Sequence, residues 1–227
     1  ISVPDNIILG ALVNPFSKKI DEKIKKLNKS GIKFLKILPY EQKIFNKDYS
    51  DLSNFIKIVN RNNMVVTVCC AYGSKYIYKT NGVELTSYLL NNGFESSLIM
   101  AHGGMKRILD AMSLMLEFPN LYMDISFSLF YWWGSTVIKN YAFALEKIEY
   151  ERVFYGSDFP YVNIKDSLFY FNKFCNRYEI NEKNKNKILK NNFENFLKKI
   201  YNKNKEWLLW KNRLLTILGK IEFLLLK

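Results

Sequence analysis

Histidine and cysteine are both scarce in this chain, which has one histidine and three cysteines among its 227 residues. The cysteines are Cys69, Cys70 and Cys175, and an odd number with two adjacent members does not resemble the disulfide framework of a small secreted protein. No run of about 18 apolar residues suits a membrane-spanning helix, and no basic-then-apolar leader opens the chain. We therefore expect a cytoplasmic protein.

Arginine is also scarce, although the net charge is strongly positive. The formal charge is +13, and only five of the 34 basic residues are arginines. Arginine is the side chain that base and phosphate recognition favours, whereas dispersed lysines support only non-specific attraction to nucleic acid. We expect a small-molecule substrate and no specific nucleic-acid partner, and the sequence leaves a homo-oligomer open.

Apolar residues, in contrast, are abundant, at 48% of the chain with 16% aromatic residues, which is enough for one large core. Short apolar runs indicate strands, and each is followed by a segment with the apolar spacing of a helix. The predicted strands cover residues 7–13, 33–39, 64–71, 97–102, 121–126 and 152–155. Beyond Tyr161 only helices are predicted. This alternation predicts an α/β fold with parallel strands covered on both faces.

Residues that can carry chemistry follow three of these strands. Cys69 ends one apolar run, His102 with Gly103 and Gly104 follows another, and Asp158 follows the last. Because the carboxyl ends of parallel strands meet at one edge of the sheet, we expect these side chains to converge there. The two glycines would allow a ligand to approach the backbone closely.

Each of these residues also has a structural interpretation. A histidine after an apolar run is often a hydrogen-bonded structural residue, a carboxylate there often caps the next helix, and Cys69 suits a buried apolar position. Ser126 and Asp124 close the fifth strand, and Lys36 lies within the second. The sequence leaves open whether those three side chains reach the same edge.

Several segments resemble, in order and spacing, successive blocks of the amidohydrolase-related branch of the amidohydrolase superfamily. They are residues 31–42 (GIKFLKILPYEQ), 99–104 (IMAHGG), 119–126 (PNLYMDIS), 152–161 (RVFYGSDFPY) and 192–197 (NFENFL). The resemblance implies a TIM-barrel-like (β/α)₈ fold with a divalent metal, usually zinc. It also implies hydrolase or non-oxidative decarboxylase activity on a small amide or carboxylate.

The resemblance also implies roles for single residues. Asp158 corresponds to the acid that binds the metal or its water, and His102 to the histidine that acts as acid and base. Cys69 stands where the resemblance implies a metal-ligating histidine, so we predict Asp158 and Cys69 as metal ligands. Gly103, Gly104 and Ser126 are predicted to contact the substrate.

The chain departs from the family pattern in three ways. The Asp-x-His-x-His segment of the first strand has no counterpart, Cys69 replaces a histidine, and Leu38 stands where many relatives have a histidine before the proline. About six of eight β/α units are visible, which predicts an incomplete barrel without its first two strands. An alternative function is therefore a catalytically inactive barrel that binds a ligand or acts as a scaffold.

The predicted domains are a barrel over residues 1–203 and a basic extension, rich in tryptophan and leucine, over residues 204–227. The extension is predicted to be helical, packed on the barrel or at a dimer contact. A basic helix of this composition can also lie on a membrane surface.

Overall fold

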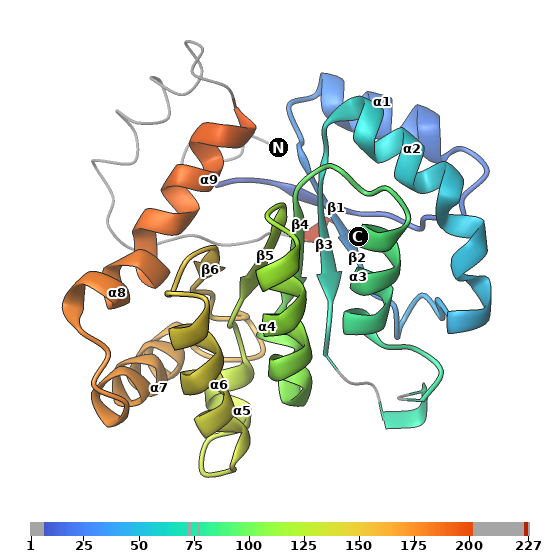
Figure 1. Cartoon of the computed structure of the whole chain (residues 1–227). Coiled ribbons are helices and arrows are strands. Elements are labelled where there is room, and N and C mark those ends of the chain that lie inside the picture. Colours follow the sequence, from blue (N-terminus) through green and yellow to red (C-terminus); the bar gives the residue numbers. More distant parts are fainter. Residues whose placement is uncertain (1–6, 72–73, 77, 202–224, 227) are drawn as a thin grey trace.

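The fold is built on a parallel sheet (Figure 1). A computed structural model describes residues 7–71, 74–76, 78–201 and 225–226. The strands are β1 (Gly10–Leu12), β2 (Phe34–Ile37), β3 (Val65–Cys69), β4 (Leu98–Ala101), β5 (Leu121–Asp124), β6 (Val153–Phe154) and β7 (Leu225–Leu226). They pair in parallel in the order β6-β5-β4-β3-β2-β1-β7.

The strand order identifies the architecture. From β1 to β6, strands that are consecutive in the chain are neighbours in the sheet, so the order never reverses as it does in a doubly wound fold. A steady progression of parallel strands, each followed by helical structure, is the arrangement of a β/α barrel. The chain thus forms an incomplete α/β barrel, and the six predicted strands are confirmed.

Helices follow the strands along the chain. They are α1 (Ile20–Lys29), α2 (Ser53–Asn62), α3 (Gly82–Asn91), α4 (Ile108–Glu117), α5 (Ser128–Tyr131), α6 (Val137–Lys147), α7 (Ile164–Arg177), α8 (Glu182–Asn186) and α9 (Asn192–Ile200). Short 3₁₀ helices cover Asn46–Leu52 (η1), Ser74–Tyr76 (η2) and His102–Arg107 (η3). Asparagine side chains cap α3, α7 and α8 by accepting backbone N–H groups.

Both faces of the sheet are apolar, as the near-continuous apolar strands predict. The outer face carries Leu35, Val66, Met100 and Met123, which pack with the helices in one large core. The alternate residues point to the opposite face, which we call the inner face. There Phe34, Val65, Ile99, Tyr122 and Phe154 pack against Phe193, Phe196 and Leu197 of α9. Figure 1 shows α9 across the strands from α2 and α3.

The helical stretch over residues 182–200 is interrupted. A π-helical segment, η4 (Lys187–Asn191), separates α8 from α9. A π turn frees a backbone carbonyl from its usual helical partner, and the Ile188 carbonyl accepts the Tyr155 N–H at 3.0 Å. The Asn192 amide then donates to the Tyr150 and Val153 carbonyls at 2.7 and 2.9 Å. This segment therefore ties the helical end of the chain to β6.

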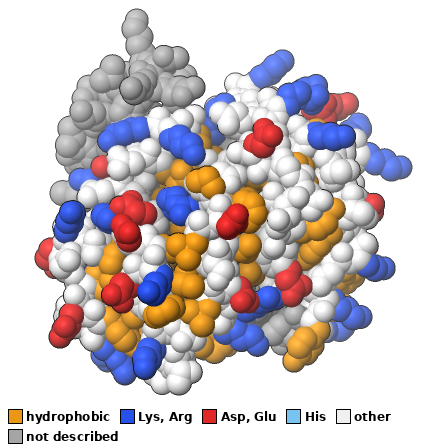
Figure 2. Space-filling view, in the orientation of Figure 1, with side chains coloured by type: hydrophobic (Ala, Val, Ile, Leu, Met, Phe, Trp, Pro, Cys, Tyr) orange, Lys and Arg blue, Asp and Glu red, His pale blue; other side chains and the backbone are white. Residues whose placement is uncertain are grey.

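The extension over residues 204–227 lies almost entirely outside the described residues. Its two described residues form β7, whose backbone pairs with Gly10 and Ala11 of β1. Within the described part of the chain, no helix combines the length and apolar character needed to span a membrane. Figure 2 shows acidic and basic side chains interspersed over one face, with apolar side chains gathered over α4 and α6.

Candidate active site

The candidate site lies at the carboxyl ends of β2 to β6, on the inner face. The apolar layer that α9 covers gives way there to Lys36 on β2, Cys69 on β3 and Asp124 on β5. His102 directly follows β4, and Asp158 follows β6. We call these five side chains the mouth of the sheet. The charges of Cys69 and Asp158 both act on the His102 imidazole, so these three side chains share the carboxyl edge of the sheet.

His102 is the centre of the mouth, and each of its polar groups has a partner. Its backbone N–H donates to Asp124 Oδ1 at 3.2 Å, and its carbonyl accepts the hydroxyls of Tyr141 and Ser128 at 2.8 and 2.7 Å. Ring Nδ1 lies 3.1 Å from both the carbonyl and the hydroxyl of Ser126. These contacts hold the imidazole in one orientation.

Ser126 and Asp124 support the histidine from the neighbouring strand. The Asp124 Oδ1 atom accepts the Ser126 backbone N–H at 2.9 Å and also the Ser126 hydroxyl. Asp124 therefore joins the end of β5 to the start of η3. Ser126 is buried under the His102 ring, and its predicted contact with substrate stays a prediction.

Cys69 ends the strand next to the one that leads into His102. Its register partner on β4 is Ala101, the residue before the histidine. Burial favours a higher pKa for the Cys69 thiol, but the hydrogen bond and charge of His102, with the charge of Lys36, lower that pKa below its ordinary value. Cys69 is partly exposed, whereas Cys70 and Cys175 are buried.

The same contacts govern His102. Burial favours the neutral imidazole, but the hydrogen bond to Cys69 and the charges of Cys69, Asp124 and Asp158 outweigh burial and raise the pKa of His102 to about 9. The imidazole is therefore cationic at neutral pH.

Asp158 completes the mouth from the other side. Burial raises the pKa of its carboxyl group, and the charge of Asp124 adds to the effect, while the charges of His102 and Lys36 oppose it. Its backbone is left-handed, with φ of 62°, as is that of His102, with φ of 63°. Non-glycine residues held in this region tend to occur at functional sites.

Gly103 and Gly104 pack against helices. Both have positive φ, and a Cβ atom on Gly103 would lie 2.9 Å from the Tyr141 ring of α6. A Cβ atom on Gly104 would lie 3.0 Å from Ala111 Cβ and 3.1 Å from Val83. The glycines thus let η3 turn beneath the helices, and their predicted contact with substrate stays a prediction.

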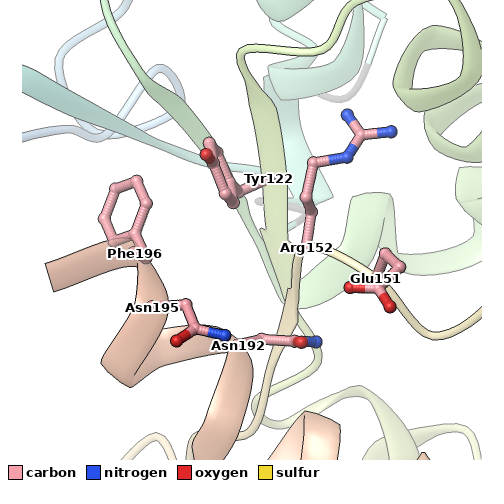
Figure 3. Close-up of a pocket in the computed structure, with 6 residues that line it drawn as sticks. All are labelled: Tyr122, Glu151, Arg152, Asn192, Asn195 and Phe196. Carbon is pink, nitrogen blue, oxygen red and sulfur yellow. The ribbon is translucent and has the colours of Figure 1, made fainter. Parts of the chain in front are cut away.

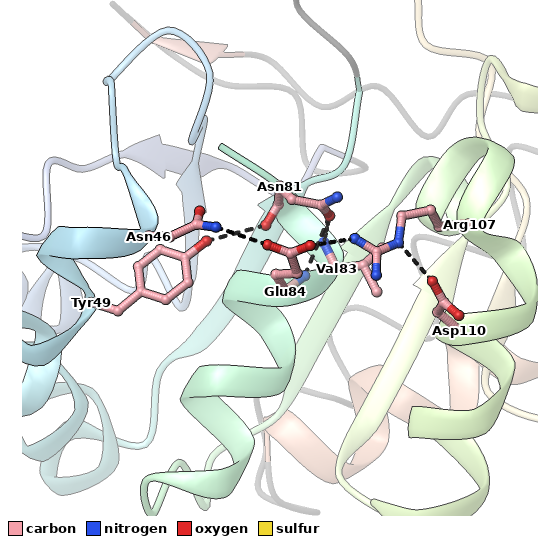
Figure 4. Close-up of polar contacts among 7 residues, drawn as sticks. All are labelled: Asn46, Tyr49, Asn81, Val83, Glu84, Arg107 and Asp110. Atoms are coloured by element: carbon pink, nitrogen blue, oxygen red, sulfur yellow. Dashed lines mark hydrogen bonds and ion pairs between the residues drawn. The ribbon is translucent and has the colours of Figure 1, made fainter. Parts of the chain in front are cut away.

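Outside the mouth, a polar network anchors η3 (Figure 4). Arg107, the last residue of η3, contacts Glu84 of α3 at 2.7 Å and Asp110 of α4 at 2.6 Å. The other oxygen of Glu84 accepts the Asn46 amide at 3.0 Å, and Asn81 caps α3 beside it. The network links the segments that follow β2, β3 and β4.

Two residues that hold the histidine could not be predicted from the sequence. Tyr141 and Ser128 both donate to the His102 carbonyl and are both fully buried. Tyr141 occupies an apolar helix position 39 residues away, and nothing local to it points to the histidine. Lys36 is one of the three residues for which the sequence left open whether the side chain reaches this edge, and its charge acts on both Cys69 and Asp158.

The predicted metal ligands do not form a complete site. Among residues 7–71, 74–76, 78–201 and 225–226, no group of three or more histidine, cysteine, aspartate and glutamate side chains is arranged to hold a metal ion. A catalytic zinc ion needs about three protein ligands. Asp124 instead accepts the His102 and Ser126 backbone N–H groups and the Ser126 hydroxyl. The described donor set does not fit the metal that the resemblance implies.

A hollow at the opposite end of the strands is not a candidate site (Figure 3). It has a volume of about 160 Å³ and is lined by Tyr122, Glu151, Arg152, Asn192, Asn195 and Phe196. The Arg152 guanidinium already donates to three backbone carbonyls, at Met115, Phe118 and Leu121. The Asn192 amide is engaged with β6. The polar groups at this hollow therefore stabilise the fold.

Comparison with known proteins supports the family that the sequence segments resemble. The model of the amidohydrolase family matches residues 5–198. No curated protein sequence matches significantly. Among solved structures, the chain is similar to an uncharacterized TIM-barrel protein from Bordetella bronchiseptica, with 16% identity, a TM-score of 0.67, and coverage of 85% of this chain and 66% of that one.

Two further structures carry functional names. One is a probable 2-pyrone-4,6-dicarboxylic acid hydrolase from Acinetobacter baumannii with bound citric acid, with 16% identity, a TM-score of 0.57 and coverage of 80% and 69%. The other is a dihydroxybenzoic acid decarboxylase from Polaromonas with bound manganese and 2-nitroresorcinol, with 15% identity, a TM-score of 0.56 and coverage of 82% and 66%. The chain thus spans about two-thirds of the length of these structures, and the likeness to them is one of fold.

Proposed function

This chain belongs to the amidohydrolase family, and we propose that it is an enzyme that hydrolyses or decarboxylates a small amide or carboxylate substrate at the mouth. The names of two structural relatives, a hydrolase and a decarboxylase that act on small carboxylic acids, support this choice of reaction. Lys36 supports the choice of substrate, because its ammonium group is a partner for a carboxylate.

The observation that carries the proposal is the fixed, cationic His102. All its polar groups are engaged, and its pKa of about 9 makes it a proton donor at neutral pH. Asp158 has a raised pKa and is therefore a stronger base than an ordinary aspartate. Acid–base catalysis requires one group that donates a proton and another that accepts one, and their different surroundings give His102 and Asp158 these two roles.

In hydrolysis, Asp158 takes a proton from water while the water oxygen bonds to the substrate carbonyl carbon. The bond to the leaving group then breaks, and His102 gives the leaving group its proton. In decarboxylation, the carbon–carbon bond breaks, carbon dioxide leaves, and the electron pair left on the substrate carbon takes the proton of His102. Both reactions use the same donor.

No step is assigned to a metal ion, because the described side chains do not supply its ligands. A zinc ion on Asp158 and Cys69, as the sequence predicts, would need further donors from outside the described residues. The structural relative with bound manganese makes a divalent metal a reasonable object of measurement, and elemental analysis of the purified protein tests for it.

The proposal is tested with a panel of small amides, esters, lactones and aromatic carboxylates, with product formation followed by chromatography. We expect turnover of at least one class, and a loss of about 10²-fold or more in kcat/KM for His102→Gln and for Asp158→Asn. Asp166→Asn, on the exposed first turn of α7, is the matched control and should keep full activity.

Two outcomes contradict the proposal. One is wild-type turnover in both variants, which would remove His102 and Asp158 from the chemistry. The other is tight binding of a panel compound, measured by calorimetry, with no product formed from any compound. That second result would favour the inactive binding barrel.

A further inference from the structure

A cluster of aromatic side chains lies where α5 and the turn after it meet α7. Tyr170 is at its centre, with its ring centroid 5.3 Å from that of Phe130, 5.4 Å from that of Trp133 and 5.4 Å from that of Phe169. The cluster reaches solvent, because Phe169 is 58% exposed and Phe130 is 39% exposed. A contiguous group of exposed apolar side chains marks a surface that contacts a protein or a membrane.

Two basic side chains of α7 lie over these rings. Lys173 Nζ is 5.0 Å from the centre of the Trp133 ring and 5.7 Å from that of Phe169. The guanidinium carbon of Arg177 is 5.9 Å from the centre of the Trp133 ring. Both basic residues are exposed. We call the four rings, together with these two cations, the aromatic surface.

The charge around the aromatic surface is positive. Residues 127–136 include no charged side chain, and α7 carries three basic residues and one acid, Asp166, which gives 3 − 1 = +2. Glu179 follows the helix, and the whole chain carries +13. Such a surface is complementary to an anionic partner. A two-fold contact between copies of the chain would instead place like charges opposite each other.

The ring geometry favours a lipid surface over a nucleic acid. Nucleobases stack on open aromatic faces, whereas Tyr170 meets its three neighbours edge to face, at interplanar angles of 88°, 63° and 89°. The Trp133 ring already carries two cations. An anionic bilayer offers an apolar layer for the ring bodies and acidic head groups for the cations at the same depth.

We propose that the aromatic surface docks the folded chain on an anionic lipid bilayer. Phe130 and Phe169 enter the head-group layer, and Lys173 and Arg177 pair with the acidic groups of the lipids. This inference does not rest on the proposed function, because it uses none of the residues of the mouth.

Docking through α5 would place the mouth beside the bilayer. Phe127, which directly precedes α5, has its ring centroid 6.2 Å from that of His102 and 5.0 Å from that of Tyr131. Tyr131 is itself exposed at the end of α5. These rings connect the buried histidine with the aromatic surface.

Co-sedimentation of the whole chain with vesicles tests the docking. The vesicles are phosphatidylcholine alone, or phosphatidylcholine with about one-third phosphatidylserine, and we expect about tenfold stronger binding to the mixture, weakening as salt is added. Phe130→Ser with Phe169→Ser should weaken binding about tenfold or more, because two apolar side chains no longer enter the bilayer. Lys173→Gln with Arg177→Gln should also weaken it about tenfold or more, since each basic side chain contributes roughly fivefold at an anionic surface.

Two double variants are matched controls. Leu116→Ser with Phe143→Ser replaces apolar side chains of α4 and α6 that are 60% and 47% exposed. Lys29→Gln with Lys57→Gln removes two exposed charges from α1 and α2, which Figure 1 shows across the molecule from α5 and α7. Both should bind within about twofold of the wild type, since distant charges are screened. Near-ultraviolet circular dichroism checks that every variant is folded.

Three outcomes overturn the inference. The first is no binding to either kind of vesicle. The second is unchanged binding in both aromatic-surface variants, which would place the lipid contact elsewhere, as on the extension over residues 204–227. The third is a wild-type dimer that Phe130→Ser with Phe169→Ser converts to a monomer in sedimentation velocity, which would make this surface an interface between copies.

Discussion

His102 illustrates how one side chain can be held by residues from several elements. Asp124 and Ser126 come from the end of β5, Ser128 from α5 and Tyr141 from α6. A net contribution of roughly 1 kcal/mol from each hydrogen bond is ordinary. Together they keep the left-handed backbone at residue 102 in place, which no local preference of histidine would do.

Gly103 makes that turn possible, and its replacement gives a prediction. Gly103→Ala would place a methyl group 2.9 Å from the Tyr141 ring at φ of +55°. The left-handed backbone alone costs an alanine roughly 1–2 kcal/mol, and the clash adds to that cost, so we expect a loss of about 3 kcal/mol or more in the free energy of unfolding. Urea unfolding measures it.

Gly134→Ala is the matched control for this prediction. Gly134 also has positive φ, at +86°, but no atom lies within 4 Å of the Cβ position. It should lose only the backbone contribution of roughly 1–2 kcal/mol. Equal losses in the two variants would mean that the Tyr141 ring moves away without cost and that the close approach at Gly103 is unimportant.

At the scale of elements, the loops after β2, β3 and β4 are joined by Glu84 and Arg107 rather than by apolar packing alone. The Arg107 guanidinium group bridges Glu84 of α3 and Asp110 of α4 (Figure 4). Arg107 is also the last residue of η3, the segment that begins with His102. Both charges are partly exposed, at 31% for Arg107 and 44% for Glu84. Solvent therefore screens the pair and limits its contribution to stability.

A double-mutant cycle with Glu84→Gln and Arg107→Gln measures that contribution. We expect a coupling of about 0.5–1 kcal/mol, reduced in 1 M salt because the Debye length shrinks to about 3 Å. The control cycle is Asp21 with Arg61, a more exposed pair at 39% and 59%, which should couple more weakly. A coupling no larger than that of the control would show that Arg107 does not anchor η3 through its charge.

The sequence allowed the six strands, most helices and the edge carrying the site to be predicted, because alternating apolar runs and helical spacing are local patterns. It did not predict α5, the π turn at Lys187–Asn191 or the hydrogen bond from the Tyr141 hydroxyl to the His102 carbonyl. Those features depend on contacts between elements far apart in the chain. The placement of Cys69 next to the strand that leads into His102 also needed the strand register, since each residue alone has a structural interpretation.

For the molecule as a whole, several buried acids predict how stability depends on pH. Burial raises the pKa of Cys70, Tyr49, Tyr150 and Tyr155, and it raises the pKa of Cys175 to about 11. The folded chain therefore holds these protons more tightly than the unfolded chain, in which thiols lose theirs near pH 9. The stability that these thiols and phenols contribute should be complete below about pH 8.5 and should fall as the pH rises through 9 to 11.

Cys175→Ala isolates one member of this set. For a single thiol shifted from 9 to about 11, the loss approaches roughly 2–3 kcal/mol by pH 11, at up to about 1.4 kcal/mol per pH unit. Below pH 9, His102 and Cys69 have opposite effects on how stability changes with pH, because the pKa of His102 is raised and that of Cys69 is lowered. The comparison is therefore made above pH 9. Urea unfolding from pH 7 to 11 under reducing conditions should give a steeper decline for the wild type than for the variant. Parallel curves would mean that Cys175 is not protected from ionisation by the core, and a wild-type curve that stays flat to pH 11 would contradict the whole set.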